Sequence, residues 1–236
     1  MGSPLLEVAV AEARDVPGAV TGGADRILLA LPGPDDGLSP DLSDASAVLR
    51  ESDVPVRVML RLNESATTTG GEFTRMVGLA EEYLALGAEG VAFGFLDPDL
   101  EIDAETCSAV ADALPGVPWT FHRVLDRVLD HRRAWRSLRA LPGLTAVASG
   151  GSVLGLSQGY DDLLAIAEGD PVVAGLLLPA GGLIAEQVPW LVRAGVHQFR
   201  IEAQARPGGS AKAYVDAGLV RSWRLLLDST AEHLAR

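Results

Sequence analysis

Short apolar runs alternate with longer amphipathic segments along the whole chain. The runs are rich in Val, Ile, Leu and Phe, and the segments between them carry hydrophobic residues at helical spacing. The predicted strands are Leu5–Val10, Asp25–Leu29, Val56–Arg61, Gly90–Phe95, Val117–His122, Leu144–Ala148, Val172–Leu178 and Val196–Ile201. The predicted helices are Glu12–Thr21, Leu42–Glu51, Glu72–Leu86, Ala104–Leu114, Arg132–Leu141, Tyr160–Ala167, Ile184–Arg193 and Val215–Ala235.

Glycines mark where several of the predicted helices end. Gly23, Gly87 and Gly195 each stand shortly before a predicted strand, and glycine adopts the left-handed conformation that commonly ends a helix. Strands that alternate with helices in this way are typical of parallel βαβ units. Eight such units in 236 residues predict a TIM (β/α)8 barrel with a C-terminal helix, as one domain over residues 1–236. An open, doubly wound sheet is the alternative, because periodicity does not prove that a sheet closes.

The charge of the chain bears on its partners. The formal net charge is −13 at pH 7, and no run of Lys or Arg offsets it. Such a surface repels the phosphate backbone of nucleic acid and anionic membrane surfaces. We therefore expect neither nucleic acid nor membrane among the partners.

Hydropathy and cysteine content bear on the compartment. Hydrophobic residues make up 48% of the chain, yet no run of 18 apolar residues predicts a transmembrane helix. Met1 leads almost directly into the first predicted strand without the pattern of a signal peptide, so a cytoplasmic location is expected. The one cysteine, Cys107, lies in a predicted helix and is expected to be a small buried hydrophobic residue, without a disulfide or a thiolate cluster.

Polar residues follow the fourth and fifth predicted strands, where TIM barrels place their catalytic groups. The fifth strand runs directly into His122 and Arg123, with Asp126 three residues on. His122 is a candidate general acid or base, or a neutral donor that orients a substrate. Asp126 either pairs with a neighbouring arginine or caps the next helix. Asp97 is a further catalytic candidate, although its position before a proline equally fits a turn and helix cap.

Alternation along the strands places charged side chains inside the barrel. Glu7 faces inward on the first strand, Arg57 and Arg61 on the third, and Arg200 and Glu202 share one face of the eighth. Buried charges need partners, so we expect Glu7 to pair with one of these arginines, as a catalytic candidate or as part of a structural ion pair. The three arginines exceed the two glutamates. That excess favours a small anionic ligand, held by Arg61 and Arg200.

Paired glycines follow the sixth and seventh predicted strands, as Gly150–Gly151 and Gly181–Gly182. Their backbone N–H groups are candidate ligands for a phosphate or carboxylate, while the alternative is a pair of tight βα turns. No nucleotide-binding loop and no histidine-rich metal spacing is present in the sequence. No metal ligand is predicted from these residues.

Several segments together resemble the CutC family, in chain order and over almost the whole length. They are Leu5–Val8, Gly23–Ile27, Asp36–Pro40, Gly90–Asp97 and Thr120–Arg123 with Asp126, followed by Ser149–Gly151 and Ala180–Gly182. The resemblance implies a cytoplasmic TIM barrel associated with copper homeostasis, with copper as the implied metal and a homo-oligomer as a possible assembly.

The chain departs from the pattern of that family near the expected site. Ala9 and Ala30 stand where relatives offer cysteine, and Leu28 stands where they have glutamate. Residues Glu64–Thr69 are inserted after the third strand, and Arg200–Glu202 replace a His-Ser-Ser-like ending of the eighth. Because Cu(I) prefers sulfur ligands, these departures predict that the chain does not bind Cu(I) tightly through cysteine.

Three functional interpretations follow. The first is an enzyme that acts on a small anionic metabolite at the C-terminal face of the barrel. The second, implied by the resemblance, is a copper-binding or copper-trafficking protein. The third is a barrel that has lost the family chemistry and serves as a binding protein.

Overall fold

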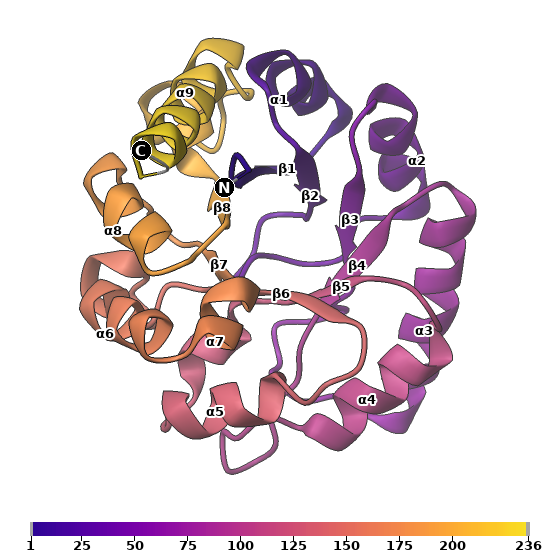
Figure 1. Ribbon diagram of the computed structural model, residues 1–236. Helices are drawn as coiled ribbons and strands as arrows, with labels where there is room; N and C mark the ends of the chain where they lie inside the picture. Colours follow the sequence, from indigo (N-terminus) through magenta and orange to yellow (C-terminus); the bar gives the residue numbers. More distant parts are fainter. Residues whose placement is uncertain (1, 235–236) are drawn as a thin grey trace.

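Eight parallel strands form a ring enclosed by helices in the computed structural model, which describes residues 2–234 (Figure 1). The ladders run in the order β7-β6-β5-β4-β3-β2-β1-β8, and β7 and β8 lie against each other to complete a nearly closed barrel. This confirms the predicted TIM barrel over the open sheet. The strands are β1 (Leu5–Val10), β2 (Arg26–Leu29), β3 (Val56–Met59), β4 (Gly90–Phe93), β5 (Trp119–Phe121), β6 (Leu144–Ser149), β7 (Leu177–Pro179) and β8 (Gln198–Ile201).

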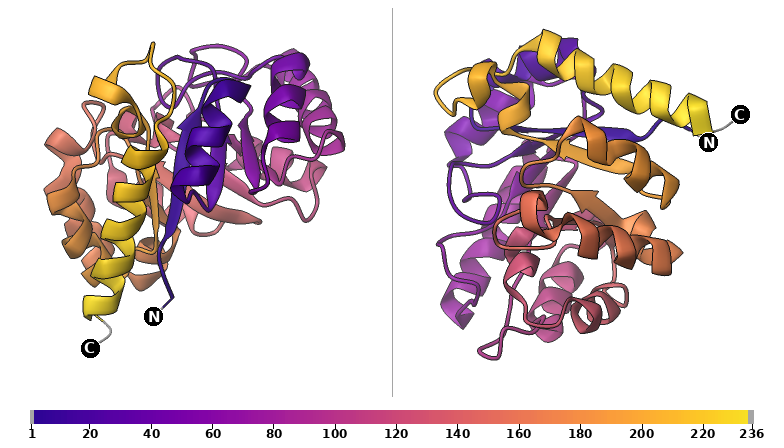
Figure 2. Two further views of the ribbon diagram at one scale, coloured as in Figure 1. Left: turned by 90° about the horizontal axis from the view of Figure 1, so that it is seen from above. Right: turned by 90° about the vertical axis from the view of Figure 1, so that its left-hand side faces the viewer.

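The helices surround the strands, and the last helix lies beside the first (Figures 1 and 2). The α-helices are α1 (Val16–Gly22), α2 (Leu42–Glu51), α3 (Gly70–Ala85), α4 (Ala104–Ala113), α5 (His131–Leu138), α6 (Leu156–Gly169), α7 (Pro171–Leu176), α8 (Val188–Arg193) and α9 (Ala217–Leu234). Short 3-10 helices are η1 (Ala13–Asp15), η2 (Arg123–Arg127), η3 (Ala185–Gln187), η4 (Ala203–Ala205) and η5 (Pro207–Gly209). Ala235, the predicted last helical residue, lies outside the described residues.

One predicted strand is wrong over most of its length. Val172–Leu178 forms the helix α7 up to Leu176, and only Leu177 onward continues as strand β7. The Asp170 side chain accepts a hydrogen bond from the backbone N–H of Val172 at 2.9 Å, and Pro171 occupies the first helical turn. An Asp cap followed by proline starts a helix, and here it outweighs the strand preference of the two valines.

The strands bury their two faces differently. Leu6, Val8 and Val10 of β1 point toward the helices and join the main hydrophobic core, together with Trp119 and Phe121 of β5. The alternation predicted this arrangement. The inward side chains include the charged ones, so the barrel interior is held by ion pairs as well as by apolar packing.

Glu7 lies at the centre of the interior ion pairs. Its Oε1 accepts a hydrogen bond from Arg200 Nε at 2.6 Å, and its Oε2 accepts one from Arg26 Nε. All three side chains are buried. Burial alone would raise the pKa of Glu7, but the charges of Arg26, Arg200 and Arg57 lower it to about 2. Arg200 is one of the three arginines predicted as possible partners of Glu7, whereas Arg26 was not assigned an inward position.

Arg57 has a structural role nearer the start of its strand. Its Nη1 donates to Thr120 Oγ1 at 2.7 Å, and its Nε donates to Glu89 at 3.0 Å. These contacts link β3 to β5 across the interior and to the turn that precedes β4. Arg57 is thus engaged within the barrel, away from the polar residues that line the mouth.

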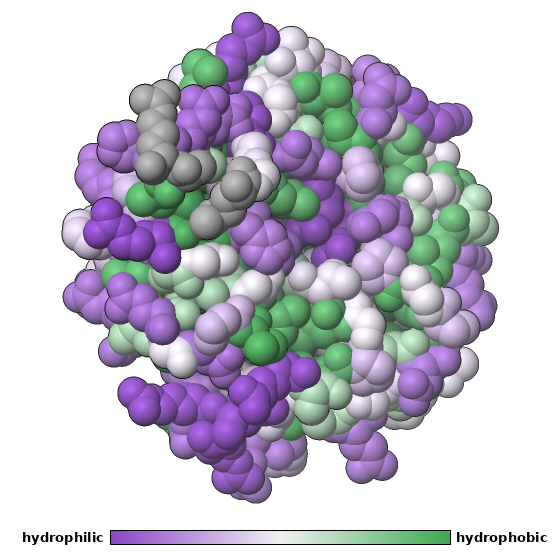
Figure 3. All heavy atoms as spheres, in the orientation of Figure 1, coloured by the Kyte–Doolittle hydropathy of each residue, from purple (hydrophilic) through white to green (hydrophobic). Residues whose placement is uncertain are grey.

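The surface over α5 corrects the expectation that no arginine run offsets the acidic charge. Four arginines are exposed there, and Figure 3 shows hydrophilic side chains gathered over this helix. Two of them pair with acidic residues, Arg133 with Glu101 at 2.5 Å and Arg139 with Asp170 at 2.8 Å. Within residues 2–234, no helix is both long and apolar enough to cross a membrane. The four exposed residues are Arg132, Arg133, Arg136 and Arg139.

We predict that Glu7→Gln lowers the free energy of unfolding by about 3–5 kcal/mol, because it leaves Arg26 and Arg200 buried without a full counter-charge. The folded-state pKa of Glu7 is depressed, so its stabilisation is present above the unfolded pKa of about 4.5 and is lost as pH falls toward about 2. Denaturant unfolding should therefore show that the difference in free energy of unfolding between Glu7→Gln and wild type becomes smaller as the pH is lowered from 7 to 2. Glu12→Gln, the same change at an exposed position, is the control and should alter stability little. A gap that stays constant with pH would contradict the assignment.

Candidate functional site

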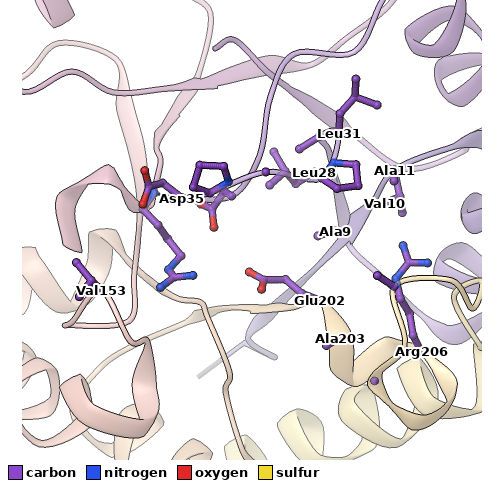
Figure 4. A pocket seen from close by; sticks show the side chains of 18 residues that line it. Ala9, Val10, Ala11, Leu28, Leu31, Asp35, Val153, Glu202, Ala203 and Arg206 are labelled. Atoms are coloured by element: carbon purple, nitrogen blue, oxygen red, sulfur yellow. Dashed lines mark hydrogen bonds between the residues drawn. The ribbon is translucent and has the colours of Figure 1, made fainter. Parts of the chain in front are cut away.

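A cavity of about 490 Å³ opens at the C-terminal mouth of the barrel, above the ends of β1, β2 and β8 (Figure 4). Small and apolar residues, including Ala9, Leu28 and Ala30, form one part of its wall. Figure 4 shows the Glu202 carboxylate pointing into the cavity from the end of β8. The charged residues that line it are Asp35, Asp36, Arg123, Glu202 and Arg206.

The segment after β2 forms a tight loop over this mouth. Leu31 and Leu38 pair as an isolated antiparallel bridge at its base. Asp35 (φ 48°) and Asp36 (φ 81°) both adopt left-handed backbone conformations before Gly37. Such φ values are uncommon outside glycine and are tolerated best by Asp and Asn. The loop uses this conformation to place two carboxylates at the mouth.

Arg61 holds this loop instead of offering a free cation. Its Nη1 donates to the carbonyl oxygen of Pro34 at 2.6 Å, and its Nη2 donates to Asp35 Oδ2 at 3.1 Å and to the Glu64 carbonyl at 2.8 Å. Arg127 binds the same Asp35 oxygen at 2.5 Å. The inserted residues Glu64–Thr69 after β3 thus help to hold Arg61, because the carbonyl oxygen of Glu64 accepts one of its hydrogen bonds.

Arg200 connects the barrel interior to the mouth. Its Nε binds Glu7, and its Nη1 donates to Asp36 Oδ2 at 2.5 Å. The backbone N–H of Arg123 donates to the same Asp36 oxygen at 3.2 Å. Arg200 Nη2 is buried without a hydrogen-bond partner among the described residues.

The expected positive excess is wrong, because the loop supplies carboxylates that strand alternation did not place. The charges at and below the mouth balance at seven arginines and seven carboxylates once every partner is included. The arginines are Arg26, Arg57, Arg61, Arg123, Arg127, Arg200 and Arg206, and the carboxylates are Glu7, Asp15, Asp35, Asp36, Glu89, Asp126 and Glu202.

Two arginines line the cavity, Arg123 and Arg206. Both terminal nitrogens of Arg206 donate to Asp15, and one also donates to the carbonyl oxygen of Ala213, so Arg123 is the candidate ligand-binding group.

The Nε of Arg123 donates to Asp126 Oδ2 at 2.9 Å, and Asp126 is held by Ser149 Oγ at 2.7 Å and by the N–H of Gly150 at 3.0 Å. Arg123 Nη1 and Nη2 make no hydrogen bond within residues 2–234. Gly181 packs on the guanidinium: a Cβ there would stand 2.4 Å from Arg123 Cζ.

Arg123 was noted in the sequence among the polar residues after the fifth strand, in the CutC-like segment and as a possible partner of Asp126, but it was not predicted to bind a ligand. A signal was present, because an aspartate three residues after an arginine can orient its guanidinium. The pKa of Arg123 is raised: burial opposes the charged form, but Asp36, Asp126 and Glu202 stabilise it.

Asp36 and Glu202 each carry a buried carboxylate oxygen without a donor among the described residues, Oδ1 and Oε1 respectively. Burial and the neighbouring charge of Asp36 raise the pKa of Glu202, against the opposing effects of Arg200 and Arg123. A carboxyl group whose pKa is raised beside a cavity is a candidate for proton exchange with a ligand.

His122 lies at the end of β5, buried beside this cluster of charges. Its Nδ1 accepts a hydrogen bond from the N–H of Val124 at 3.1 Å, which assigns the proton of the neutral ring to Nε2. Burial, together with the charges of Arg61, Arg200 and Arg127, lowers the pKa of His122 well below its usual value. The neutral donor is therefore the form of His122 that its surroundings favour.

The remaining predicted site residues lie apart from the cavity lining. Asp97 Oδ1 accepts from the N–H groups of Asp99 and Glu101, both at 2.9 Å, and so closes the turn after β4. The N–H of Gly150 binds Asp126, and that of Gly151 binds Ser149 Oγ at 3.0 Å. These two glycines support the site from behind. Gly182 is exposed beside Gly181, with open space around its Cα.

The donor set of the cavity does not fit Cu(I). Among the described residues, its lining includes oxygen and guanidinium groups but no cysteine, methionine or histidine. Met59 packs with Leu28 and Ala92 in a small interior cluster. Over residues 2–234, no group of three or more His, Cys, Asp or Glu side chains has the arrangement of a metal site.

The sequence profile of the CutC family matches residues 4–204. The chain belongs to the CutC family. A CutC family protein from Xylella fastidiosa (strain Temecula1) is 31% identical over 210 residues, covering 85% of this chain and 75% of the relative. The human copper homeostasis protein cutC homolog is 29% identical over 212 residues, covering 85% and 74%. The crystal structure of a CutC protein from Streptococcus agalactiae superposes with a TM-score of 0.70 at 20% identity, covering 84% of this chain and 97% of that one.

Several of the CutC departures noted in the sequence meet at the cavity. Ala9, Leu28 and Ala30 all line the cavity, and Glu202 points into it. This part of the wall therefore consists of small or apolar side chains, with no sulfur or carboxylate at these three positions. The residues that distinguish the chain from the family pattern thus shape the space in which a ligand would lie.

We predict that Gly181→Ala disturbs the site more than Gly182→Ala does. Both positions have left-handed φ values, 82° and 92°, so an alanine at either costs about 1–2 kcal/mol in backbone energy. Only at Gly181 does the new Cβ also collide with Arg123. Thermal unfolding should show the larger loss for Gly181→Ala, and a crystal structure should show a displaced Arg123 guanidinium. Equal effects of the two substitutions would contradict this packing.

We also predict that Cu(I) is not bound through Cys107. This thiol belongs to α4 and is fully buried, and burial raises its pKa to about 12, so the thiolate that binds metal is scarce. Competition against a Cu(I) chelator should give the same result for wild type and Cys107→Ser. Stoichiometric binding abolished by that substitution would overturn this placement.

Proposed function

We propose that this CutC-family chain is a TIM-barrel enzyme that acts on a small anionic metabolite at the C-terminal face of the barrel. The observation that carries the proposal is the state of Arg123. Its Nε is fixed by Asp126, the residue lines the cavity, and neither terminal nitrogen has a protein acceptor among the described residues. An oriented guanidinium with two free amino groups matches a carboxylate or phosphate.

Glu202 is the acid–base group we propose for this site. Its carboxylate points into the same cavity as Arg123, and its raised pKa places the proton transfer nearer to neutral pH. His122, kept neutral by the surrounding arginines, would support the site as a hydrogen-bond donor through Nε2. Glu7, with its pKa near 2 and two arginine partners, would position Arg200 and not exchange protons itself.

The other two interpretations differ in what they require at the mouth. A copper-trafficking role would need soft ligands, and the cavity offers carboxylates and guanidinium groups. A binding protein without catalysis would use the same arginine for affinity but would not convert the ligand. Turnover therefore separates the enzyme from the binding protein.

We predict that Arg123→Ala lowers the affinity for anionic ligands by about tenfold or more, as expected for the loss of a charge-assisted hydrogen-bond pair. Calorimetric titration with phosphate, sulfate and citrate measures the effect, and Arg123→Lys should recover only part of the affinity because lysine lacks the planar fork. Arg139→Ala, a partly exposed arginine on the outer surface, is the matched control. Incubation with a metabolite extract, followed by mass spectrometry, tests for a converted compound. Unchanged affinity in Arg123→Ala would contradict the proposed anion site.

A further inference from the structure

At the mouth, one oxygen of each of two buried carboxylates has no hydrogen-bond donor among the described residues. The Asp36 side chain is only 1% exposed, and its Oδ1 has no hydrogen-bond partner in the described part of the chain. Glu202 Oε1 is buried and unpartnered in the same way. A buried carboxylate oxygen without a hydrogen bond is costly. Both residues line the one cavity that also contains Arg123.

The two carboxylates interact with each other. Both carboxylates interact electrostatically with Arg200 and Arg123. The charge of Asp36 also raises the pKa of Glu202. Arg200 Nη1 and the N–H of Arg123 both bind Asp36 through Oδ2. The other oxygen, Oδ1, has no hydrogen-bond partner among the described residues.

The charge balance of the mouth restricts what that group can be. The seven arginines and seven carboxylates at and below the mouth balance each other, so a purely anionic ligand on Arg123 would add an uncompensated charge to a partly buried site. A ligand that also carries a positive group near Asp36 and Glu202 preserves the balance. An ammonium supplies three hydrogen-bond donors and a full positive charge, whereas a hydroxyl supplies one donor and no charge.

We propose that the metabolite bound at this site is zwitterionic: its anionic group binds Arg123, and its protonated amine binds Asp36 Oδ1 and Glu202 Oε1. This inference rests on the proposed function, since it extends the same cavity by a second, cation-binding subsite. It narrows the substrate class to small amino-phosphates or amino acids.

Matched probes test the second subsite without knowledge of the natural ligand. O-phosphoethanolamine carries phosphate and ammonium, 2-hydroxyethyl phosphate has a hydroxyl in place of the amine, and ethyl phosphate has neither. We expect calorimetric titration at pH 7 to give O-phosphoethanolamine an affinity about tenfold or more above that of ethyl phosphate. The pair β-alanine and propionate repeats the comparison with a carboxylate, and the amine should again improve binding.

The Glu202→Gln variant tests whether this carboxylate causes the higher affinity for the amine-containing probe. It should remove most of the advantage of O-phosphoethanolamine over ethyl phosphate while leaving the affinity for ethyl phosphate equal or higher, because a negative charge near the phosphate is gone. Glu186→Gln, the same change at an exposed position, should retain the advantage. Thermal unfolding of both variants checks that they are folded.

The outcomes separate this inference from the proposed function. Equal affinity of O-phosphoethanolamine and ethyl phosphate, with both lost in Arg123→Ala, would overturn the ammonium subsite and leave the anion site standing. Equal affinity of O-phosphoethanolamine and 2-hydroxyethyl phosphate would also overturn it, in favour of a hydroxyl donor. Absence of binding by every phosphate and carboxylate probe would overturn both.

Discussion

A continuous chain of ion pairs from Arg26 through Glu7 and Arg200 to Asp36 links the barrel interior to its mouth. Removing the two charges of Glu7 and Arg200 from water is expensive, and only the paired arrangement makes their burial tolerable. Each member therefore fixes the next. Glu7 orients Arg200, Arg200 holds Asp36, and Asp36 holds the loop that covers the site.

Most charged residues of the mouth are likewise paired with one another, so few of their polar atoms lack a partner. Asp35 satisfies Arg61 and Arg127, and Asp126 satisfies the Nε of Arg123. After these pairings, the described residues that line the cavity still include the terminal nitrogens of Arg123 and single oxygens of Asp36 and Glu202 without a hydrogen-bond partner, while Arg61 Nε and Arg200 Nη2 are unpartnered deeper in the network. Ligand specificity in this barrel would then come from these few unpartnered groups, while the other charged residues of the mouth bind one another.

Periodicity was enough to predict the barrel and the sides on which most strand residues lie, because strand alternation is a local property. It failed at α7, where an Asp-Pro start decided the local structure. It also failed at the mouth, because the positions of Asp35 and Asp36 depend on left-handed backbone angles and on distant arginines. Arg61 shows the difference well: its inward direction was predictable, but its partners at Pro34, Asp35 and Glu64 come from two loops whose conformations no strand pattern specifies.

The place where β7 meets β8 has a further consequence. Seven neighbouring strand pairs share ladders, whereas these two stand at the ends of the hydrogen-bonded order, and the side chain of Gln198 reaches across to the carbonyl of Gly175 at 3.1 Å. Backbone pairing is thus thinnest between the strands that lead to Gly181 and to Glu202. Widening of this seam would separate the surface that supports Arg123 from the carboxylate that faces it. The two halves of the candidate site therefore lie on either side of the junction with the least backbone pairing. A ligand that contacts both halves would hold β7 and β8 together.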